Sequence, residues 1–318
     1  MTHNVPSNNI PLSFRWRKNL GISFVAALFF LLAVPSASGQ TTDIARLEYL
    51  YIPFSKSDND IARYRALLQL PIPVGAAKEE YLVIGLQYRY VELGIEDDEI
   101  FTASQLEQLQ SVQRIEAYLG YVFKVNDNWR IGVRGGARIN SNLVGSLVGD
   151  DIIYETAVYA INDRKNADIP KPYRLIFGLN YSTTPGRSFP LPMINYFRQF
   201  HPDWTYTIGV PKSNIRRYLN RSHKDAIQAF GTLDNFFGNI QNNLVIPGTT
   251  VKGENVSMTN VLFGIGYEHF FTDHLLFYTY AAHSVHNEFR IRDNERETAY
   301  VINDDNTFYF RGGIKFRF

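Results

Sequence analysis

Hydrophobic and polar residues alternate along most of the chain, most clearly in the final stretch, 307–318. One face of this stretch carries Phe308, Phe310, Ile314, Phe316 and Phe318. The other face carries Tyr309, Arg311, Lys315 and Arg317. Successive side chains of a strand point to opposite faces, and a strand that crosses a membrane needs ~9–11 residues. A slip by one residue would place the basic side chains in lipid, at ~2–4 kcal/mol each near the midplane. The pattern therefore predicts a membrane-spanning strand with a well-defined register.

The same two-residue period recurs upstream and predicts the other strands. They cover 45–51, 63–70, 82–90, 115–124, 129–139, 152–161, 173–182, 191–200, 204–210, 256–268 and 275–291. Segment 152–161 is apolar on both faces and has no phase, and 275–291 changes phase midway, which indicates a β-bulge. The fold class predicted is all-β: a transmembrane antiparallel up-and-down β-barrel of about twelve strands, within a range of about ten to fourteen.

Connection lengths give this barrel an orientation. Barrels of this kind keep both termini and the short turns in the periplasm and the long loops outside. The short connections are 73–79, 126–128, 162–172, 201–203 and 271–273, and the long ones are 91–111, 141–151, 211–255 and 293–306. The parity of the strands then places Asp97 and Asn294 outside, and Asp127 and Asn128 in the periplasm.

Segment 212–254 departs from the alternating pattern. Apolar residues recur there at spacings of three and four, at Ile227, Phe230, Leu233, Phe237, Ile240 and Leu244. This spacing is typical of an amphipathic helix and favours a helical lid or plug. The alternative is an extra hairpin, which would bring the barrel to about fourteen strands.

The beginning of the chain has the composition of a secretory signal peptide. Arg15, Arg17 and Lys18 precede an apolar run over 20–34, and small residues follow over 35–40. The run is shorter than the ~20 residues that a spanning helix needs. The predicted domains are therefore a signal peptide over 1–39 and a barrel over 40–318. Export combined with a membrane-crossing strand predicts the outer membrane of a Gram-negative bacterium.

Composition excludes several function classes. The net charge is +1, so no overall charge directs the protein toward nucleic acid. The chain has no cysteine, which rules out disulfides and thiolate chemistry. The sequence predicts no cofactor. It leaves the oligomeric state open, and outer-membrane lipid is the expected surrounding.

Three parts of the sequence resemble a family of uncharacterised, porin-like outer-membrane barrel proteins of Gram-negative bacteria. They are 119–124 with 128–129, 177–182 with 190–192 and 204–211, and 309–318. The resemblance implies the fold and the location, and it assigns no residue a role. A C-terminal Phe318 on such a strand also resembles the signal recognised by the barrel assembly machinery, which is the partner it implies.

The predicted lumen face is rich in basic residues. They form a predicted basic ladder made of Arg46, Arg63, Arg65, Arg89, Lys124, Arg130, Arg134, Arg138, Arg174, Arg311, Lys315 and Arg317. The acidic residues phased to the same face are Glu48, Glu116 and Glu268. Two interpretations follow: an open basic pore, or an arginine wall neutralised by carboxylates from loops or unphased strands in a narrow barrel.

These features predict a passive channel or transporter for small solutes, with a preference for anions where the lumen is open. The alternative is a non-conducting barrel with a structural or partner-binding role through its outer loops. A lipid-modifying enzyme comes third: Ser284 and His286 share a face of a regular strand but lack a third partner, so no catalytic residue is predicted. The acidic run Glu92, Glu96, Asp97, Asp98 and Glu99 lacks the ligand spacing of a calcium loop, and no metal site is predicted.

Overall fold

The computed structural model describes residues 43–76, 79–97, 99–164, 169–246 and 248–317. The signal peptide predicted over 1–39 and the terminal Phe318 lie outside the described residues. No helix in the described ranges is long and apolar enough to cross a membrane. The helical elements are α2 (Ala103–Gln108) and a 3-10 turn, η2 (Gly149–Asp151).

In the described ranges, fifteen strands make up one sheet, which is antiparallel except where β11 meets β5. The first seven are β1 (Asp43–Pro53), β2 (Asp60–Val74), β3 (Glu80–Gly94), β4 (Ser111–Lys124), β5 (Arg130–Ser141), β6 (Ile152–Asp163) and β7 (Tyr173–Ser182). The other eight are β8 (Leu191–His201), β9 (Trp204–Val210), β10 (Lys212–Tyr218), β11 (Asp225–Val245), β12 (Lys252–Phe270), β13 (Leu275–Arg292), β14 (Thr298–Asn303) and β15 (Phe308–Arg317).

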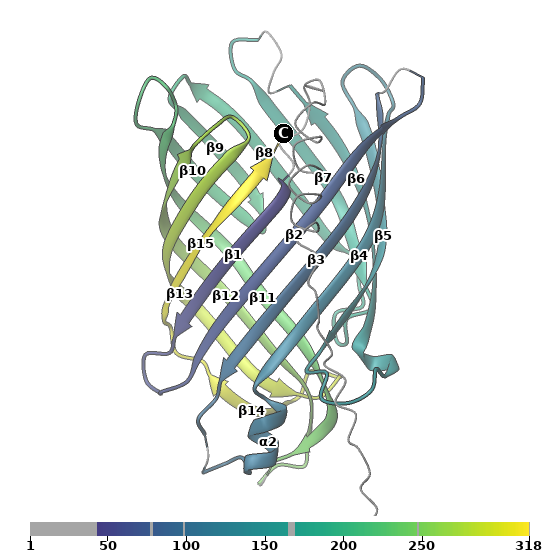
Figure 1. Cartoon of the computed structure of the whole chain (residues 1–318), viewed down its shortest axis with the longest axis vertical. Coiled ribbons are helices and arrows are strands. Elements are labelled where there is room, and N and C mark those ends of the chain that lie inside the picture. Colours follow the sequence, from purple (N-terminus) through teal and green to yellow (C-terminus); the bar gives the residue numbers. More distant parts are fainter. Residues whose placement is uncertain (1–42, 77–78, 98, 165–168, 247, 318) are drawn as a thin grey trace, which may run out of the picture. The chain divides into compact units, whose positions relative to one another are not determined.

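The sheet closes on itself into a barrel (Figure 1). Consecutive strands pair from β1 to β13, and β15 pairs with both β13 and β1. The short β14 pairs with the end of β13 beside the loop, so fourteen of the fifteen strands form the wall. The prediction of about twelve strands was therefore slightly low, and the closed antiparallel barrel is confirmed.

The outer surface of the wall is apolar, as a lipid-facing surface must be. On β15, Phe308 is 55% exposed and Phe310 45%, while Tyr309 between them is fully buried on the inner face. On β1, Leu47 is 65% exposed and Glu48 is buried. The register predicted for the last strand is therefore confirmed. A β-bulge at Val285 of β13, where Val261 and Leu262 pair with His286 and Ser284, confirms the predicted change of phase.

The helix expected over 212–254 is not present, because this segment forms β10, β11 and the first residues of β12. The extra hairpin of the alternative prediction supplies the two missing wall strands. Ile227 and Leu233 face outward and Phe230 faces inward, as in an ordinary strand. Farther along, where β11 leaves the wall, Gly238, Asn239 and Ile240 are buried in succession, so the period of two is lost there.

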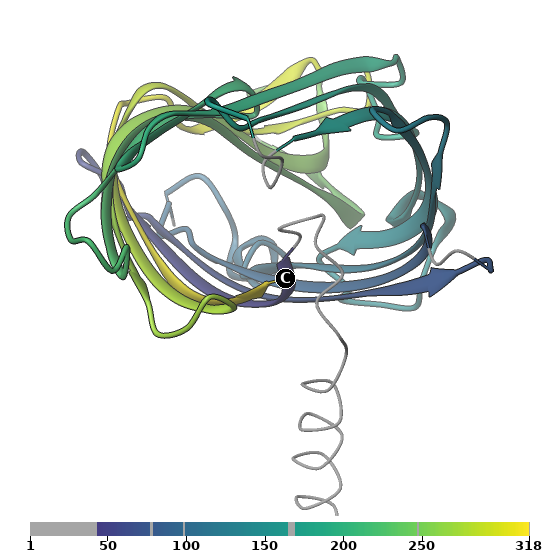
Figure 2. The same ribbon diagram turned by 90° about the horizontal axis from the view of Figure 1, so that it is seen from above.

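The wall has unequal height. Strands β9 and β10 have seven residues each, whereas β11 has 21. Strand β10 accompanies β11 only as far as Thr232. Beyond that point β11 crosses toward β5, where Asn239 pairs with Ser141 and its carbonyl accepts a bond of 3.0 Å from the Asn142 amide (Figure 2). The end of the barrel that bears the long loops is therefore narrower than the other.

The long loops lie at one end of the barrel and the tight turns at the other (Figure 1). The acidic loop after β3 is fixed by Asp97, which accepts hydrogen bonds from Asn59 (3.2 Å) and from the hydroxyl of Tyr300 (3.2 Å). Burial and the Asp97 carboxylate raise the pKa of Tyr300 to about 12. In the described ranges no group of three or more metal-ligating side chains could hold a metal ion.

Candidate functional site

The interior of the barrel divides into two parts along its length. The part nearest the long loops, called here the outer core, is packed with apolar side chains. Its members include Ile52, Phe54, Ile61, Leu93, Phe101, Leu109, Val112, Phe236, Ile240, Leu244, Met258, Phe289 and Ile291. They come from the wall, from the loop that holds α2, and from the outer parts of β11 and β12. These apolar side chains pack against one another at the loop end of the interior.

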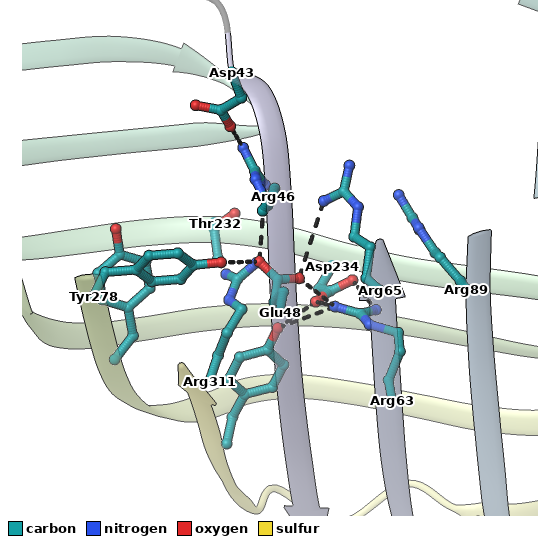
Figure 3. A network of polar contacts seen from close by, with 12 residues as sticks. Asp43, Arg46, Glu48, Arg63, Arg65, Arg89, Thr232, Asp234, Tyr278 and Arg311 are labelled. Carbon is teal, nitrogen blue, oxygen red and sulfur yellow. Dashed lines mark hydrogen bonds and ion pairs between the residues drawn. The ribbon is translucent and has the colours of Figure 1, made fainter. Parts of the chain in front are cut away.

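An ion pair spans the interior on the side of the outer core that faces the tight turns. Arg63 of β2 donates two hydrogen bonds to the carboxylate of Asp234 of β11, at 3.0 and 2.9 Å. The Tyr309 hydroxyl also donates to Asp234. Strands β2 and β11 are separated in the barrel order by β1, β15, β13 and β12, so this contact joins two distant parts of the wall (Figure 3).

Beside this pair, Glu48 of β1 is surrounded by arginines (Figure 3). Its carboxylate lies within 3.7–4.0 Å of the guanidinium groups of Arg46, Arg63, Arg65 and Arg311. The Tyr278 hydroxyl donates to it at 2.6 Å. The Glu48 carboxylate therefore lies close to four guanidinium groups, and one of them, that of Arg63, also pairs with Asp234.

A second carboxylate, Glu268 of β12, organises the opposite wall. It pairs with Arg216 of β10 at 2.9 Å and accepts hydrogen bonds from Tyr280 and Gln228, each at 2.7 Å. Beside it, the ammonium of Lys212 lies 4.4 Å from the centre of the Tyr280 ring. This is a cation–π contact, which attracts a cation without neutralising it.

A third cluster joins β4, β5 and β6. Glu116 pairs with Arg114 at 2.5 Å and with Arg134 at 3.0 Å. Glu155 pairs with Arg134 at 3.2 Å and also with Arg138. Glu155 belongs to the segment 152–161, for which the sequence shows no phase. Part of the basic wall is thus paired with carboxylates from strands whose faces the sequence did not resolve, as the second interpretation expected.

Several cations remain without a carboxylate. Among the described residues none lies within 4.0 Å of the side-chain nitrogens of Arg89, Lys212 or Lys315. Arg89 stands between Arg65 and Arg114 in the register of β2, β3 and β4. Like charges directly opposite each other repel, so this row adds positive potential to the interior. Arg134 and Arg46 keep side-chain exposures of 27% and 19%, so this part of the interior admits solvent.

The remaining members of the predicted ladder lie toward the turn end. Lys124 pairs with Glu79 at 2.9 Å and Asp127 at 3.0 Å. Arg130 and Arg174 stand at the first and second positions of β5 and β7, and the guanidinium of Arg317 lies 4.8 Å from the Phe270 ring centre. The ladder is therefore a set of separate clusters, and Arg134 and Arg138 are paired whereas Arg89 and Lys315 are not.

The charged residues of the interior that the sequence did not predict include Arg114, Glu155, Lys212, Arg216 and Asp234. Arg114 lies two residues before Glu116, so extending the alternation by one period would have found it. Glu155 is the one charged residue of 152–161. The other three belong to the segment interpreted as a helix, where no strand phase was assigned.

The histidine and serine side chains weighed for catalysis do not converge. The bulge at Val285 places Ser284 on the inner face, 1% exposed, and His286 on the outer face, so the shared face expected from a regular strand is wrong. The Ser284 hydroxyl donates to the Thr307 carbonyl at 3.3 Å and accepts from the Thr307 amide at 2.7 Å. Ser284 therefore joins β13 to the start of β15.

Comparisons with known proteins give matches among solved structures. No family model matches the chain, and no curated protein matches it. Among solved structures it is similar to an outer-membrane channel from Pseudomonas putida F1, with 11% identity, a TM-score of 0.39, and coverage of 90% of this chain and 100% of that one. The NanC porin has 9% identity, a TM-score of 0.37, and coverage of 86% and 100%. The KdgM porin has 9% identity, a TM-score of 0.34, and coverage of 86% and 99%.

At these TM-scores the similar structures carry no argument about what this chain binds. The class of protein follows from its own architecture: a closed antiparallel barrel with an apolar belt outside and charged groups inside. This is the architecture of a Gram-negative outer-membrane β-barrel.

Proposed function

We propose that the protein is a passive outer-membrane channel for small anionic solutes, closed at its outer end in the state described here. The observation that carries the proposal is the excess of inward-facing cations, in particular Arg89, Lys212 and Lys315, which have no carboxylate partner among the described residues. A cation held away from bulk water is unfavourable unless a counter-charge compensates it. Mobile anions in a hydrated interior supply that compensation.

The positive potential of the interior acts on anions over a limited distance. Charges of one sign that line a cleft with low-dielectric walls concentrate counter-ions. Salt screens such a field over ~8 Å at physiological ionic strength, a length comparable to the radius of a narrow pore. An anion that enters from the periplasmic end therefore meets an attractive potential before it reaches the Arg63–Asp234 pair.

Passage to the other side requires the outer core to open. The part of the wall suited to this is the outer hairpin, defined as residues 233–245 of β11 and 252–254 of β12. Strand β10 no longer pairs with it beyond Thr232. It is held in place by the Arg63–Asp234 pair, by the pairing of Asn239 with Ser141, and by hydrogen bonds that Asn239 and Gln241 donate to the Asp151 carboxylate.

The reversal potential across a salt gradient in planar bilayers tests the charge preference. We expect anion selectivity in the wild type, and a shift toward zero in Arg89→Gln and in Lys315→Gln. Arg221→Gln, at an exposed position of the β10–β11 turn, serves as the matched control and should behave as the wild type. Cation selectivity, or no shift in either lumen variant, would contradict the proposal.

A second candidate function is a non-conducting barrel whose outer loops bind a partner or stabilise the envelope. The observation in its favour is the outer core, in which Leu109, Ile240 and Ile291 are at most 1% exposed. Recording in planar bilayers distinguishes the two functions. If bilayers stay silent even when the Arg63–Asp234 pair is broken, the second function is the better account.

A further inference from the structure

Two adjoining grooves are hollowed into the lipid-facing side of β9–β13. The first groove has a volume of about 620 Å³ and is lined by Phe200, Ile208 and Phe263, among others. The second groove lies nearer the turn end, has a volume of about 550 Å³, and is lined by Trp204, Arg217, Ile265 and Ala281, among others. Both are lined by Ile215 and Ala229, so they form one continuous depression, called here the double groove.

The hollow follows from the sequence. Outward positions in its floor carry small side chains, at Ala229, Gly231 and Ala281, whereas larger residues stand beside them at Ile215, Phe263 and Ile265. Gly231 is required for this shape, because a Cβ there would lie 2.9 Å from the Phe263 ring. The outward face of β15, with Phe308, Phe310 and Ile314, has no such run of small residues.

One end of the double groove carries a cation. Arg217 faces outward from β10, since its neighbour Arg216 pairs with Glu268 inside. Its guanidinium lies 5.5 Å from the centre of the Trp204 ring. No carboxylate of the described residues lies within 4.0 Å of it, and Asp225 is occupied by Tyr267 at 2.6 Å and His269 at 2.7 Å. Trp204 begins β9 directly after a tight turn, which places this cation at the periplasmic interface.

We propose that the double groove binds one anionic phospholipid of the periplasmic leaflet. The two acyl chains occupy the two grooves, and the phosphate contacts Arg217 beside Trp204. An apolar hollow that opens into the membrane takes hydrocarbon, and tryptophan is favoured at the headgroup level. A basic side chain near the surface favours anionic lipid about fivefold. The apolar lining of the double groove thus selects a lipid with acyl chains, and Arg217 selects a lipid with an anionic headgroup.

A third groove of about 480 Å³ shows what the double groove adds. It lies over β1–β3, β13 and β15. Its outward-facing lining, with Leu47, Tyr49, Tyr64 and Ile314, contains no cation, because Glu48 and Arg65 of the same strands point inward. It therefore provides hydrocarbon contact without a site for a phosphate.

The position of Trp204 allows a direct test. The sequence has three tryptophans, so Trp16→Phe with Trp129→Phe leaves Trp204 as the single fluorophore. The purified protein is placed in phosphatidylcholine vesicles that contain brominated phosphatidylglycerol, and separately in phosphatidylglycerol vesicles that contain brominated phosphatidylcholine. Bromine quenches only nearby tryptophan, so the two titrations give the relative affinity of the lipid beside Trp204. We expect about a fivefold preference for the anionic lipid.

Two variants and one control make the result decisive. Arg217→Gln should bring the preference close to one, and Ala229→Phe, which fills the floor of the double groove, should reduce quenching by both lipids. Arg198→Gln, on the lipid side of β8 where Arg198 donates to the Tyr196 hydroxyl at 3.4 Å, should leave the preference unchanged. Two results would overturn the proposal: equal quenching by both lipids when Arg217 is present, or a preference for the anionic lipid that survives Arg217→Gln. Either result would mean that the lipid beside Trp204 is not held by Arg217. Neither outcome depends on whether the barrel conducts.

Discussion

Replacing Asp234 by Asn is expected to open the outer end of the barrel. The Arg63 and Asp234 side chains are 5% and 12% exposed and meet through two hydrogen bonds of 2.9–3.0 Å. Removing one partner of a buried ion pair costs about 3–5 kcal/mol, because the remaining charge is left uncompensated. If most of that loss falls on the docked outer hairpin, the ratio of open to closed barrels should rise by roughly 10² to 10³, at about 1.4 kcal/mol per tenfold change.

Single-channel recording in planar bilayers measures this ratio directly. The matched control is Arg63→Met combined with Asp234→Leu, which removes both charges. Replacing a buried pair by apolar residues is often neutral for stability, so this double variant should stay as closed as the wild type. Glu288→Gln, which loses a partly exposed pair with Arg290, should also have little effect. An open probability for Asp234→Asn equal to that of the wild type would refute the role assigned to the pair.

Two further predictions concern the ends of the barrel. Labelling of single cysteines on intact cells should mark Asp97→Cys and spare Asp127→Cys, because the first lies in a long loop and the second in a tight turn; the opposite result would reverse the orientation. At Asp151, burial alone would raise the pKa of the carboxyl, but hydrogen bonds from Ser141, Val148, Asn239 and Gln241 hold it below 3.8. The stabilisation is therefore complete above this pH and lost as pH falls through the lower folded value. Asp151→Asn should melt below the wild type at pH 7, and the difference should vanish in strong acid.

The wall of the barrel was predictable because lipid imposes a strict alternation on it. Leu47 and Glu48 face opposite sides as the period of two requires. The tight turns also fell where the sequence placed them, since Asn126 and Pro202 are residues that turns favour. The assignment failed over 212–254, although β10 and the first part of β11 lie in the lipid-facing wall. Farther along β11, Gly238, Asn239 and Ile240 are buried in succession, so no alternation marks this part as a strand.

The charged interior was predictable in sign and not in pairing. Which carboxylate meets which arginine depends on contacts between distant strands, such as Arg63 with Asp234, that no local pattern records. Arg134 and Arg138 lie on the same strand as Arg130 and share the predicted phase. They are nevertheless paired to Glu155 through the neighbouring β6. A charge count along single strands therefore overstates the free positive charge.

The outer hairpin is the part of the wall where opening is least expensive. Elsewhere each wall strand is joined to neighbours on both sides, so separating it would break a ladder of backbone hydrogen bonds. From 234 to 238, β11 has a backbone ladder with β12 alone, and at its far end one backbone pair, Asn239 with Ser141, joins it to β5. Gly238 allows the close approach to β4, since a Cβ there would lie 2.4 Å from the Val112 side chain. Regions with few backbone ladders open first, so we expect the proposed channel to open by releasing this hairpin while the remaining wall stays intact.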